Sequence, residues 1–212
     1  VVLQDDAGTL IEQVERRPRV ELPIPVLKPT RRRQDPLTIS NHVPRDLAYF
    51  NGLGGFSHDG REYVTILNPT SHSPAPWVNV IANPHIGTVV SESGSAYTWV
   101  ENSHEYRLTP WMNDPVSDNC GEAIYLRDEE TGHYWSPTPA PARGDNTYVA
   151  RHGFGYTIFD FEEDGIVTEL CIYVSVDEPV KFSRLKITNR SGRRRQLSLT
   201  GYWEWVLGEL RG

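Results

Sequence analysis

A tract near the middle of the chain combines two tryptophans with a dense set of hydrogen-bonding side chains. It covers residues 97–118 and reads YTWVENSHEYRLTPWMNDPVSD. Sugars are recognised by an aromatic face against their C–H side, together with amide, carboxylate and guanidinium groups that bond their hydroxyls. The tract therefore predicts a carbohydrate-binding loop whose candidate residues are Trp99, Asn102, Arg107, Trp111, Asn113 and Asp114. The alternative is that the tryptophans pack in the core while the polar side chains face solvent.

Carboxylates in the same region raise the question of catalysis. Asp114 with Asp118, or Glu101 with Glu105, could in principle form the acid and base pair of a glycosidase. The chain has 28 Asp and Glu among 212 residues, however, so close pairs arise by chance. The G-x-S-x-G pattern of a nucleophile elbow is absent from the sequence as well. The residues alone therefore favour neither a catalytic carboxylate pair nor a Ser-His-Asp triad.

The glycine-rich segment at residues 51–60, NGLGGFSHDG, could suggest a phosphate-binding loop. A dinucleotide loop follows a strand and opens a helix, whereas here a predicted strand comes next. We expect these glycines to serve tight turns. The seven histidines show no pair at i, i+2 or i, i+4 and no neighbouring cysteine pair, so neither a metal nor another cofactor is expected.

Short stretches rich in Val, Ile, Tyr and Trp, separated by turn residues, indicate that β-strands position these side chains. The predicted strands are residues 61–67, 86–91, 96–100, 122–126 and 147–151. Helical periodicity is nearly absent. The pattern predicts an all-β fold of antiparallel strands.

The last third of the chain shows the clearest alternation. Apolar residues recur at every second position from Ile166 to Val176, and again from Leu197 to Leu207. Turn residues fall at 163–165, 177–179 and 189–192. Long antiparallel strands in this order predict a sandwich or barrel. Because the second run reaches the end of the sequence without a turn, we expect the sheet to continue beyond it.

The first 36 residues have a different composition from the remainder. Prolines are interspersed with arginines there, including the triplet Arg31, Arg32 and Arg33. Prolines at this spacing favour extended or turn geometry. Residues 1–36 are therefore predicted to form a connector or strap, and residues 37–212 a β-sandwich domain.

Composition restricts the classes of partner. The net charge of −7 and the pI near 5.5 argue against nucleic acid, and no run of about 18 apolar residues suggests a membrane span. The single methionine is Met112, which leads us to expect a piece of a larger protein. The two cysteines, Cys120 and Cys171, could form at most one disulfide.

Seven ordered blocks of the chain resemble the β-sandwich domain of the inverting glycoside phosphorylases of glycoside hydrolase family 94, and most closely the phosphorylase region of the cyclic β-1,2-glucan synthases. The blocks are FNGLGGFSHDGREYV (50–64), PAPWVNVIANP (74–84), VSESGSAYTWVENS (90–103), RLTPWMNDPVSD (107–118), EAIYLRDEETGHYWSPTP (122–139), RHGFGYT (151–157) and YWEWVLG (202–208). They span nearly the whole chain.

The resemblance implies a galactose mutarotase-like antiparallel supersandwich, truncated here at its C-terminal edge, that precedes an (α/α)6 catalytic barrel. In the family, inorganic phosphate attacks the anomeric carbon and releases α-glucose 1-phosphate with inversion. The general acid and the phosphate ligands lie in the barrel, so no catalytic residue maps onto this chain. The implied partners are a β-glucan oligosaccharide, the barrel and a second subunit, and the implied location is the cytoplasmic side of the inner membrane.

Two other interpretations remain open at this stage. The chain could be a free-standing carbohydrate-binding module, which predicts measurable affinity for glucan. It could also be a purely structural interaction domain, which predicts self-association without sugar binding and gives residues 1–36 the role of a strap to a partner.

Overall fold

The computed structural model describes residues 46–111, 114, 116 and 118–208, together with Thr9 and Ile11. In this described part the chain forms strands connected by turns and loops, which confirms the predicted all-β class. The strands are β1 (Gly54–Phe56), β2 (Glu62–Leu67), β3 (Val78–Ala82), β4 (Ile86–Ser91), β5 (Ala96–Val100), β6 (Glu122–Asp128), β7 (Tyr134–Trp135), β8 (Tyr148–Gly153), β9 (Tyr156–Glu163), β10 (Ile166–Val174), β11 (Lys181–Asn189) and β12 (Leu197–Trp203).

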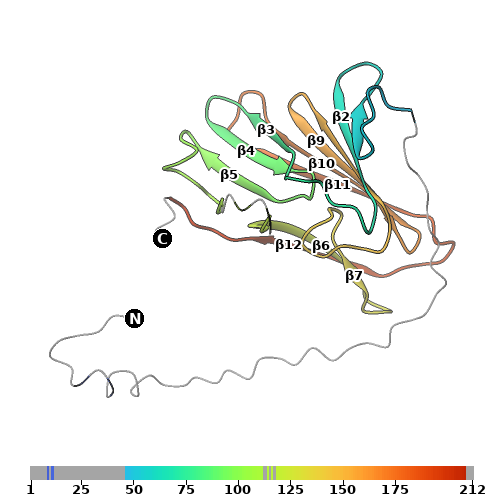
Figure 1. Cartoon of the computed structure of the whole chain (residues 1–212). Coiled ribbons are helices and arrows are strands. Elements are labelled where there is room, and N and C mark those ends of the chain that lie inside the picture. Colours follow the sequence, from blue (N-terminus) through green and yellow to red (C-terminus); the bar gives the residue numbers. More distant parts are fainter. Residues whose placement is uncertain are drawn as a thin grey trace.

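The strands form three antiparallel sheets (Figure 1). The largest has the order β1-β2-β8-β9-β10-β11, and the two smaller ones have the orders β3-β4-β5 and β12-β6-β7. Figure 1 shows β3-β4-β5 alongside the large sheet and β12-β6-β7 below it. The two small sheets therefore share the task of covering one face of the large sheet.

Two apolar clusters fill the spaces between the sheets. The first joins β3, β4 and β5 to the large sheet through Ile81, Ile86, Val90, Ala96, Ala150, Phe159, Leu170, Ile172 and Val174. The second joins β6 and β7 to the same face through Leu67, Leu126, Trp135, Tyr148, Phe161 and Ile166. Burial of these side chains provides the main driving force for the assembly.

The alternation predicted for the last third of the chain is confirmed in β10, whereas β12 forms a strand whose apolar residues Leu199 and Trp203 are 56% and 40% exposed. In β10, the residues at even positions from Ile166 to Val174 are buried, whereas Val176 lies beyond the strand and is 82% exposed. β12 ends at Trp203, so Trp205 and Leu207 are not part of it. The chain instead turns toward residues 107 and 108, where the amide of Val206 donates to Leu108 O at 3.0 Å.

Five strands, β1, β3, β7, β9 and β11, were not predicted. β1 and β7 have 3 and 2 residues, too few for a pattern. β11 is an edge strand with mostly exposed side chains, so its sequence is largely polar. In β3 the pattern is inverted, because Val78 and Val80 are exposed while Asn79 donates to Gly153 O and Tyr156 O, both at 2.9 Å. β3 and β11 therefore lack the apolar alternation that is typical of a half-buried strand.

A buried ion pair connects all three sheets. The Lys181 ammonium on β11 lies 2.5 Å from Glu122 Oε2 on β6 and also donates to Thr88 and Thr98 at 2.9 and 3.1 Å. The hydroxyls of Thr98 and Thr109 donate to Glu122 Oε1 at 2.6 and 2.7 Å. Both Glu122 oxygens and the Lys181 ammonium thus have partners, as a buried charge requires.

Several sequence expectations concern parts that the structure describes only in part. The predicted strap over residues 1–36 lies outside the described residues apart from Thr9 and Ile11, and so does Asn113. Both cysteines are free, and burial raises the pKa of the Cys120 thiol to about 11. Within the described ranges, no helix is both long and apolar enough to span a membrane.

Candidate carbohydrate-binding face

Strand β5 places two aromatic rings on the outer face of the β3-β4-β5 sheet. Because side chains alternate along a strand, Tyr97 and Trp99 share this face while Thr98 points inward to Glu122. Trp111 lies on the other side of Tyr97. The ring centroid of Tyr97 is 5.2 Å from that of Trp99 and 5.0 Å from that of Trp111. The three side chains therefore form one row, here called the ring row, with Tyr97 in the centre.

A glycine allows Trp99 to lie close to the sheet. Gly87 on β4 is the register partner of Trp99, and a Cβ atom placed on Gly87 would lie 2.1 Å from Trp99 Cζ2. No side chain fits at that distance. The absence of a Cβ atom on Gly87 thus leaves room for the indole ring to lie against this face of the sheet.

We expect Gly87→Ala to displace the Trp99 ring, because the added methyl group occupies the space of the indole. The near-UV circular dichroism signal of the ring row should change, and the free energy of unfolding should fall by about 1–3 kcal/mol, as for other overpacked sites. Val80→Ala is the matched control, since Val80 is on the same face but 60% exposed. An unchanged near-UV spectrum in Gly87→Ala would contradict the close contact.

Arg107 adds a positive charge at the edge of the ring row. Its backbone forms isolated antiparallel β-bridges with Trp99 on one side and with Gly208 on the other. The Arg107 Nε donates to Ser103 O at 3.2 Å. Burial raises the pKa of the Tyr97 hydroxyl, and the Arg107 charge offsets part of that rise. Tyr97 is therefore a neutral group beside a cation, and it is only 8% exposed, so the flanking tryptophans offer most of the accessible ring surface.

The other sequence candidates have local roles in the described structure. Asn102 Oδ1 accepts from the amides of His104 and Glu105 at 2.8 and 3.0 Å, which closes the turn after β5. Asp114 Oδ1 accepts from the amide of Val116 at 2.9 Å. The structure thus brings Trp99, Trp111 and Arg107 together and uses Asn102 and Asp114 oxygens to shape their loops.

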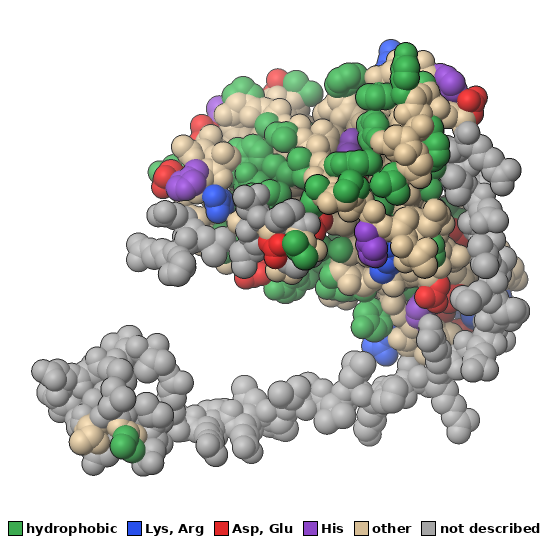
Figure 2. All heavy atoms as spheres, in the orientation of Figure 1, with side chains coloured by type: hydrophobic (Ala, Val, Ile, Leu, Met, Phe, Trp, Pro, Cys, Tyr) green, Lys and Arg blue, Asp and Glu red, His purple; other side chains and the backbone are tan. Residues whose placement is uncertain are grey.

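Apolar side chains extend the ring row toward the edge of the sheet. Val80 pairs with Val89, which pairs with Tyr97, so the three share the outer face. Val78 and Val80 are 45% and 60% exposed. Figure 2 shows hydrophobic side chains gathered where Figure 1 places β4 and β5. We call the ring row together with Val78, Val80 and Val89 the aromatic face.

Tyr97 was missed as a candidate although the sequence held a signal for it. It precedes Trp99 by two positions within the predicted strand 96–100, so strand alternation already places both rings on one face. Gly87 and Val89 had no such signal. Their position opposite β5 depends on the pairing register, which the tertiary structure sets.

The carboxylates considered for catalysis are engaged with nearby side chains. Asp118 Oδ2 accepts from the hydroxyls of Ser91, at 2.8 Å, and Ser93. Glu101 lies 2.9 Å from His85 Nδ1. Glu105 similarly lies 2.8 Å from His104 Nδ1. These contacts give each group a local structural role.

Known proteins similar to this chain point to one family. The family model "Glycosyl hydrolase 94, supersandwich domain" matches residues 61–211. The cyclic β-(1,2)-glucan synthase NdvB of Rhizobium meliloti (strain 1021) is 42% identical over 187 residues, which cover 88% of this chain and 7% of that protein. The N,N'-diacetylchitobiose phosphorylase of Vibrio furnissii is 34% identical over 160 residues, or 74% of this chain and 20% of that protein. The solabiose phosphorylase of Paenibacillus borealis is 28% identical, with the same two coverages.

The chain therefore spans a small part of the relatives that it matches. The family match covers most of the described strands, from β2 to β12, and agrees with the antiparallel sheets of the structure. The resemblance found in the sequence is confirmed: this chain belongs to the glycosyl hydrolase 94 supersandwich domain family.

Proposed function

We propose that this chain is the non-catalytic β-sandwich part of a glycoside phosphorylase or cyclic β-1,2-glucan synthase, and that its aromatic face binds β-linked glucan. The single observation that carries the binding role is the ring row, in which Trp99, Tyr97 and Trp111 lie on one face beside Arg107. Aromatic faces take the C–H side of a sugar ring, and a guanidinium donates to its hydroxyls. The relatives named for glucan synthesis and disaccharide phosphorolysis support this choice of ligand.

The proposal assigns the chemistry to a part of the protein outside this chain. Phosphorolysis of β-glucan to α-glucose 1-phosphate, with inversion at the anomeric carbon, takes place in an (α/α)6 barrel, where inorganic phosphate is bound. The sandwich supports the barrel and contributes to a dimer, on the cytoplasmic side of the inner membrane. The aromatic face would then hold a glucan chain close to that barrel.

A purely structural role is the second candidate, and the exposed Val78 and Val80 favour it. These valines offer no hydrogen bonds to a sugar but would pack well against another protein surface. In that case the aromatic face contacts the barrel or a second subunit. Measurable glucan affinity would favour the binding role over the structural one. The free-standing binding module predicts the same affinity and is tested by the same measurement.

Titration with linear β-1,2-glucooligosaccharides, followed by tryptophan fluorescence and calorimetry, tests the binding role. We expect saturable binding, and we expect Trp99→Ala and Trp111→Ala each to weaken it at least tenfold, about 1.4 kcal/mol. Both variants remove a stacking ring. Tyr134→Ala is the matched control, because Tyr134 is a 57% exposed aromatic residue on β7, in another sheet.

Cellobiose and maltose serve as competing sugars in the same titration. A flat response to millimolar glucan from a chain with an intact unfolding transition would reject the binding role and favour the structural one. Equal loss of binding in Tyr134→Ala would place the glucan elsewhere on the molecule.

A further inference from the structure

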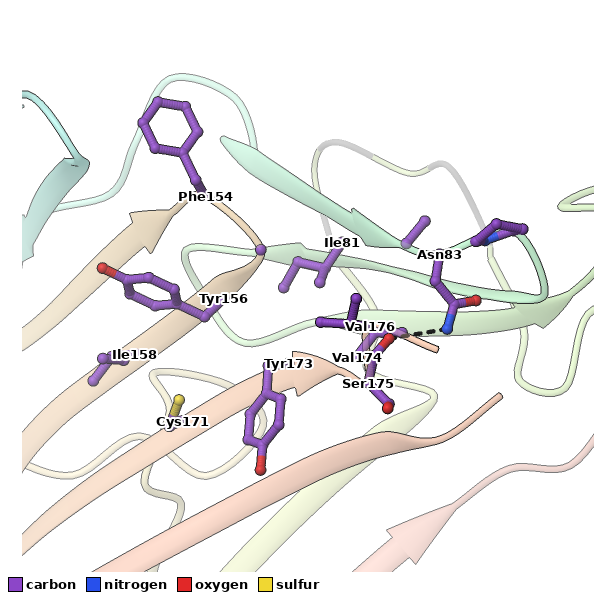
Figure 3. A pocket seen from close by; sticks show the side chains of 13 residues that line it. Ile81, Asn83, Phe154, Tyr156, Ile158, Cys171, Tyr173, Val174, Ser175 and Val176 are labelled. Atoms are coloured by element: carbon purple, nitrogen blue, oxygen red, sulfur yellow. Dashed lines mark hydrogen bonds between the residues drawn. The ribbon is translucent and has the colours of Figure 1, made fainter. Parts of the chain in front are cut away.

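An apolar groove away from the aromatic face lies at one end of the large sheet (Figure 3). It has a volume of about 700 Å³ and lies between the end of β3, the β8–β9 turn and the end of β10. Figure 3 shows Tyr156 and Ile158 on β9 and Tyr173 on β10, while Phe154 lies in the β8–β9 turn and Val176 follows the end of β10. We call it the aromatic groove.

Two of these side chains project into solvent although both are apolar. Phe154 is 83% exposed and Val176 is 82% exposed. Tyr173 stacks on Phe182 of β11, with ring centroids 5.0 Å apart and planes at 16°, and Phe182 is itself 42% exposed. These exposed apolar side chains beside a groove make it a candidate interaction site.

Two of the polar side chains that line the groove are engaged within the chain. The Tyr156 hydroxyl donates to Glu62 Oε1 at 2.8 Å. The Asn83 amide donates to Ser175 O and Glu178 O at 2.9 and 2.8 Å. The groove is therefore mainly apolar, which suits an apolar, proline-rich peptide, because proline has no N–H and needs few hydrogen-bonding partners.

The chain itself contains a peptide of this chemistry. Residues 20–29 read VELPIPVLKP, with three prolines and five Val, Leu and Ile side chains. Prolines at this spacing favour the polyproline II conformation, which docks in grooves lined by aromatic side chains. We propose that residues 20–29 bind in the aromatic groove and thereby tie the N-terminal segment across the outer face of the large sheet.

The position at which the described chain begins supports this assignment. Asp46 lies 3.0 Å from His58, in the turn between β1 and β2. Glu62, which follows that turn, pairs with Gly153 of β8, immediately before Phe154. The described chain therefore begins at the same end of the sheet as the groove.

The length of the intervening segment is sufficient. From β2 to β10 there are three strand spacings, roughly 15 Å in total. The 16 residues between Pro29 and Asp46 can span roughly 50 Å when extended. Residues 20–29 can therefore reach the groove without strain.

Charge favours the same occupant. Asp177 and Glu178 are exposed and directly follow Val176 at the rim of the groove. Lys28 lies near the end of the proline-rich segment, and three arginines at 31–33 follow the segment. Opposite charges at the rim would orient the segment.

Limited trypsin digestion of the full chain tests this proposal. The cleavage rates at Arg19 and at residues 31–33, which flank the segment, report whether it is held. We expect Phe154→Ser with Val176→Ser, and separately Ile24→Ser with Val26→Ser, to increase these rates about tenfold. Val78→Ser with Val80→Ser is the matched control, because it removes two exposed apolar side chains on the aromatic face.

Equal cleavage rates in the original chain and all three variants would overturn the proposal. Sedimentation at several protein concentrations gives a second test. If the groove variants abolish self-association, a second copy of the chain occupies the groove instead. Protection from trypsin that requires added glucan would likewise reject the internal segment as the occupant.

Discussion

Lys181→Met is expected to destabilise the fold by about 3–5 kcal/mol, because it leaves the Glu122 carboxylate buried without its counter-charge. The two side chains are only 11% and 9% exposed. The ammonium also donates to Thr88 and Thr98, so its loss removes contacts to β4 and β5 as well as to β6. One substitution thus affects the junction of all three sheets.

Denaturant unfolding checks this expectation, with Lys186→Met as the matched control. Lys186 is on the same strand but exposed, so its removal should change the free energy of unfolding by less than about 0.5 kcal/mol. For a chain of this size, the Lys181 variant should lower the melting temperature by roughly 10 °C. A change in Lys181→Met no larger than that of the control would refute a stabilising role of the pair.

The same pair makes stability depend on pH. Burial opposes ionisation of Glu122, but the Lys181 charge and the hydrogen bonds from Lys181, Thr98 and Thr109 outweigh it and lower the pKa of Glu122. A carboxyl whose pKa is lower when folded contributes stability above its unfolded pKa, and this contribution is lost as the pH falls through the folded pKa. We expect the original chain to lose stability below about pH 4.5 more steeply than a Glu122→Gln, Lys181→Met double variant.

Arg195→Met should have an effect of similar size, about 3–5 kcal/mol, at the other end of the molecule. Asp128 and Arg195 have side chains 0% and 3% exposed. Arg195 Nε lies 2.8 Å from Asp128 Oδ2, and Nη1 donates to Asp164 O at 2.8 Å. Asp128 Oδ1 accepts from the Glu130 amide at 2.8 Å. The substitution would leave Asp128 charged and buried, and would loosen the turns after β6 and β9.

Arg193→Met is the matched control for this pair. Arg193 lies two residues away, and its guanidinium is 2.6 Å from Glu130, but these side chains are 28% and 49% exposed. Exposed pairs contribute about 0–1 kcal/mol. Thermal unfolding of both variants should therefore separate them by several degrees, and similar melting temperatures would argue against the importance of the Asp128–Arg195 pair.

The two proposals concern different surfaces and can fail independently. The aromatic face is centred on Tyr97, Trp99 and Trp111, whereas the aromatic groove lies between the end of β3, the β8–β9 turn and the strands β9 and β10. Loss of glucan affinity in Trp99→Ala tests the first and leaves the trypsin pattern unchanged. Faster trypsin cleavage in the Phe154 and Val176 variant tests the second and leaves glucan affinity unchanged.

Local pattern in the sequence was sufficient for most of the strands that bury one face, although β9 was missed despite its alternating burial. Predicted strands 86–91 and 96–100 coincide with β4 and β5, and the alternation from Ile166 to Val174 coincides with β10. These strands have one face in the core, so period-two alternation of apolar residues reports them directly. β3 and β11 escaped this logic because their exposed faces or polar contacts are decided by neighbours far away in sequence.

The candidate site shows the same division. The sequence by itself determined the all-β class and the family, because residue types and ordered motifs carry that information, and it singled out Trp99, Trp111 and Arg107 as candidates. Only the tertiary structure placed Tyr97 between the tryptophans and Gly87 beneath one of them. It alone joined Lys181 to Glu122, which is 59 residues away. Strand pairing register and sheet packing bring such residues together, and neither leaves a local trace in the chain.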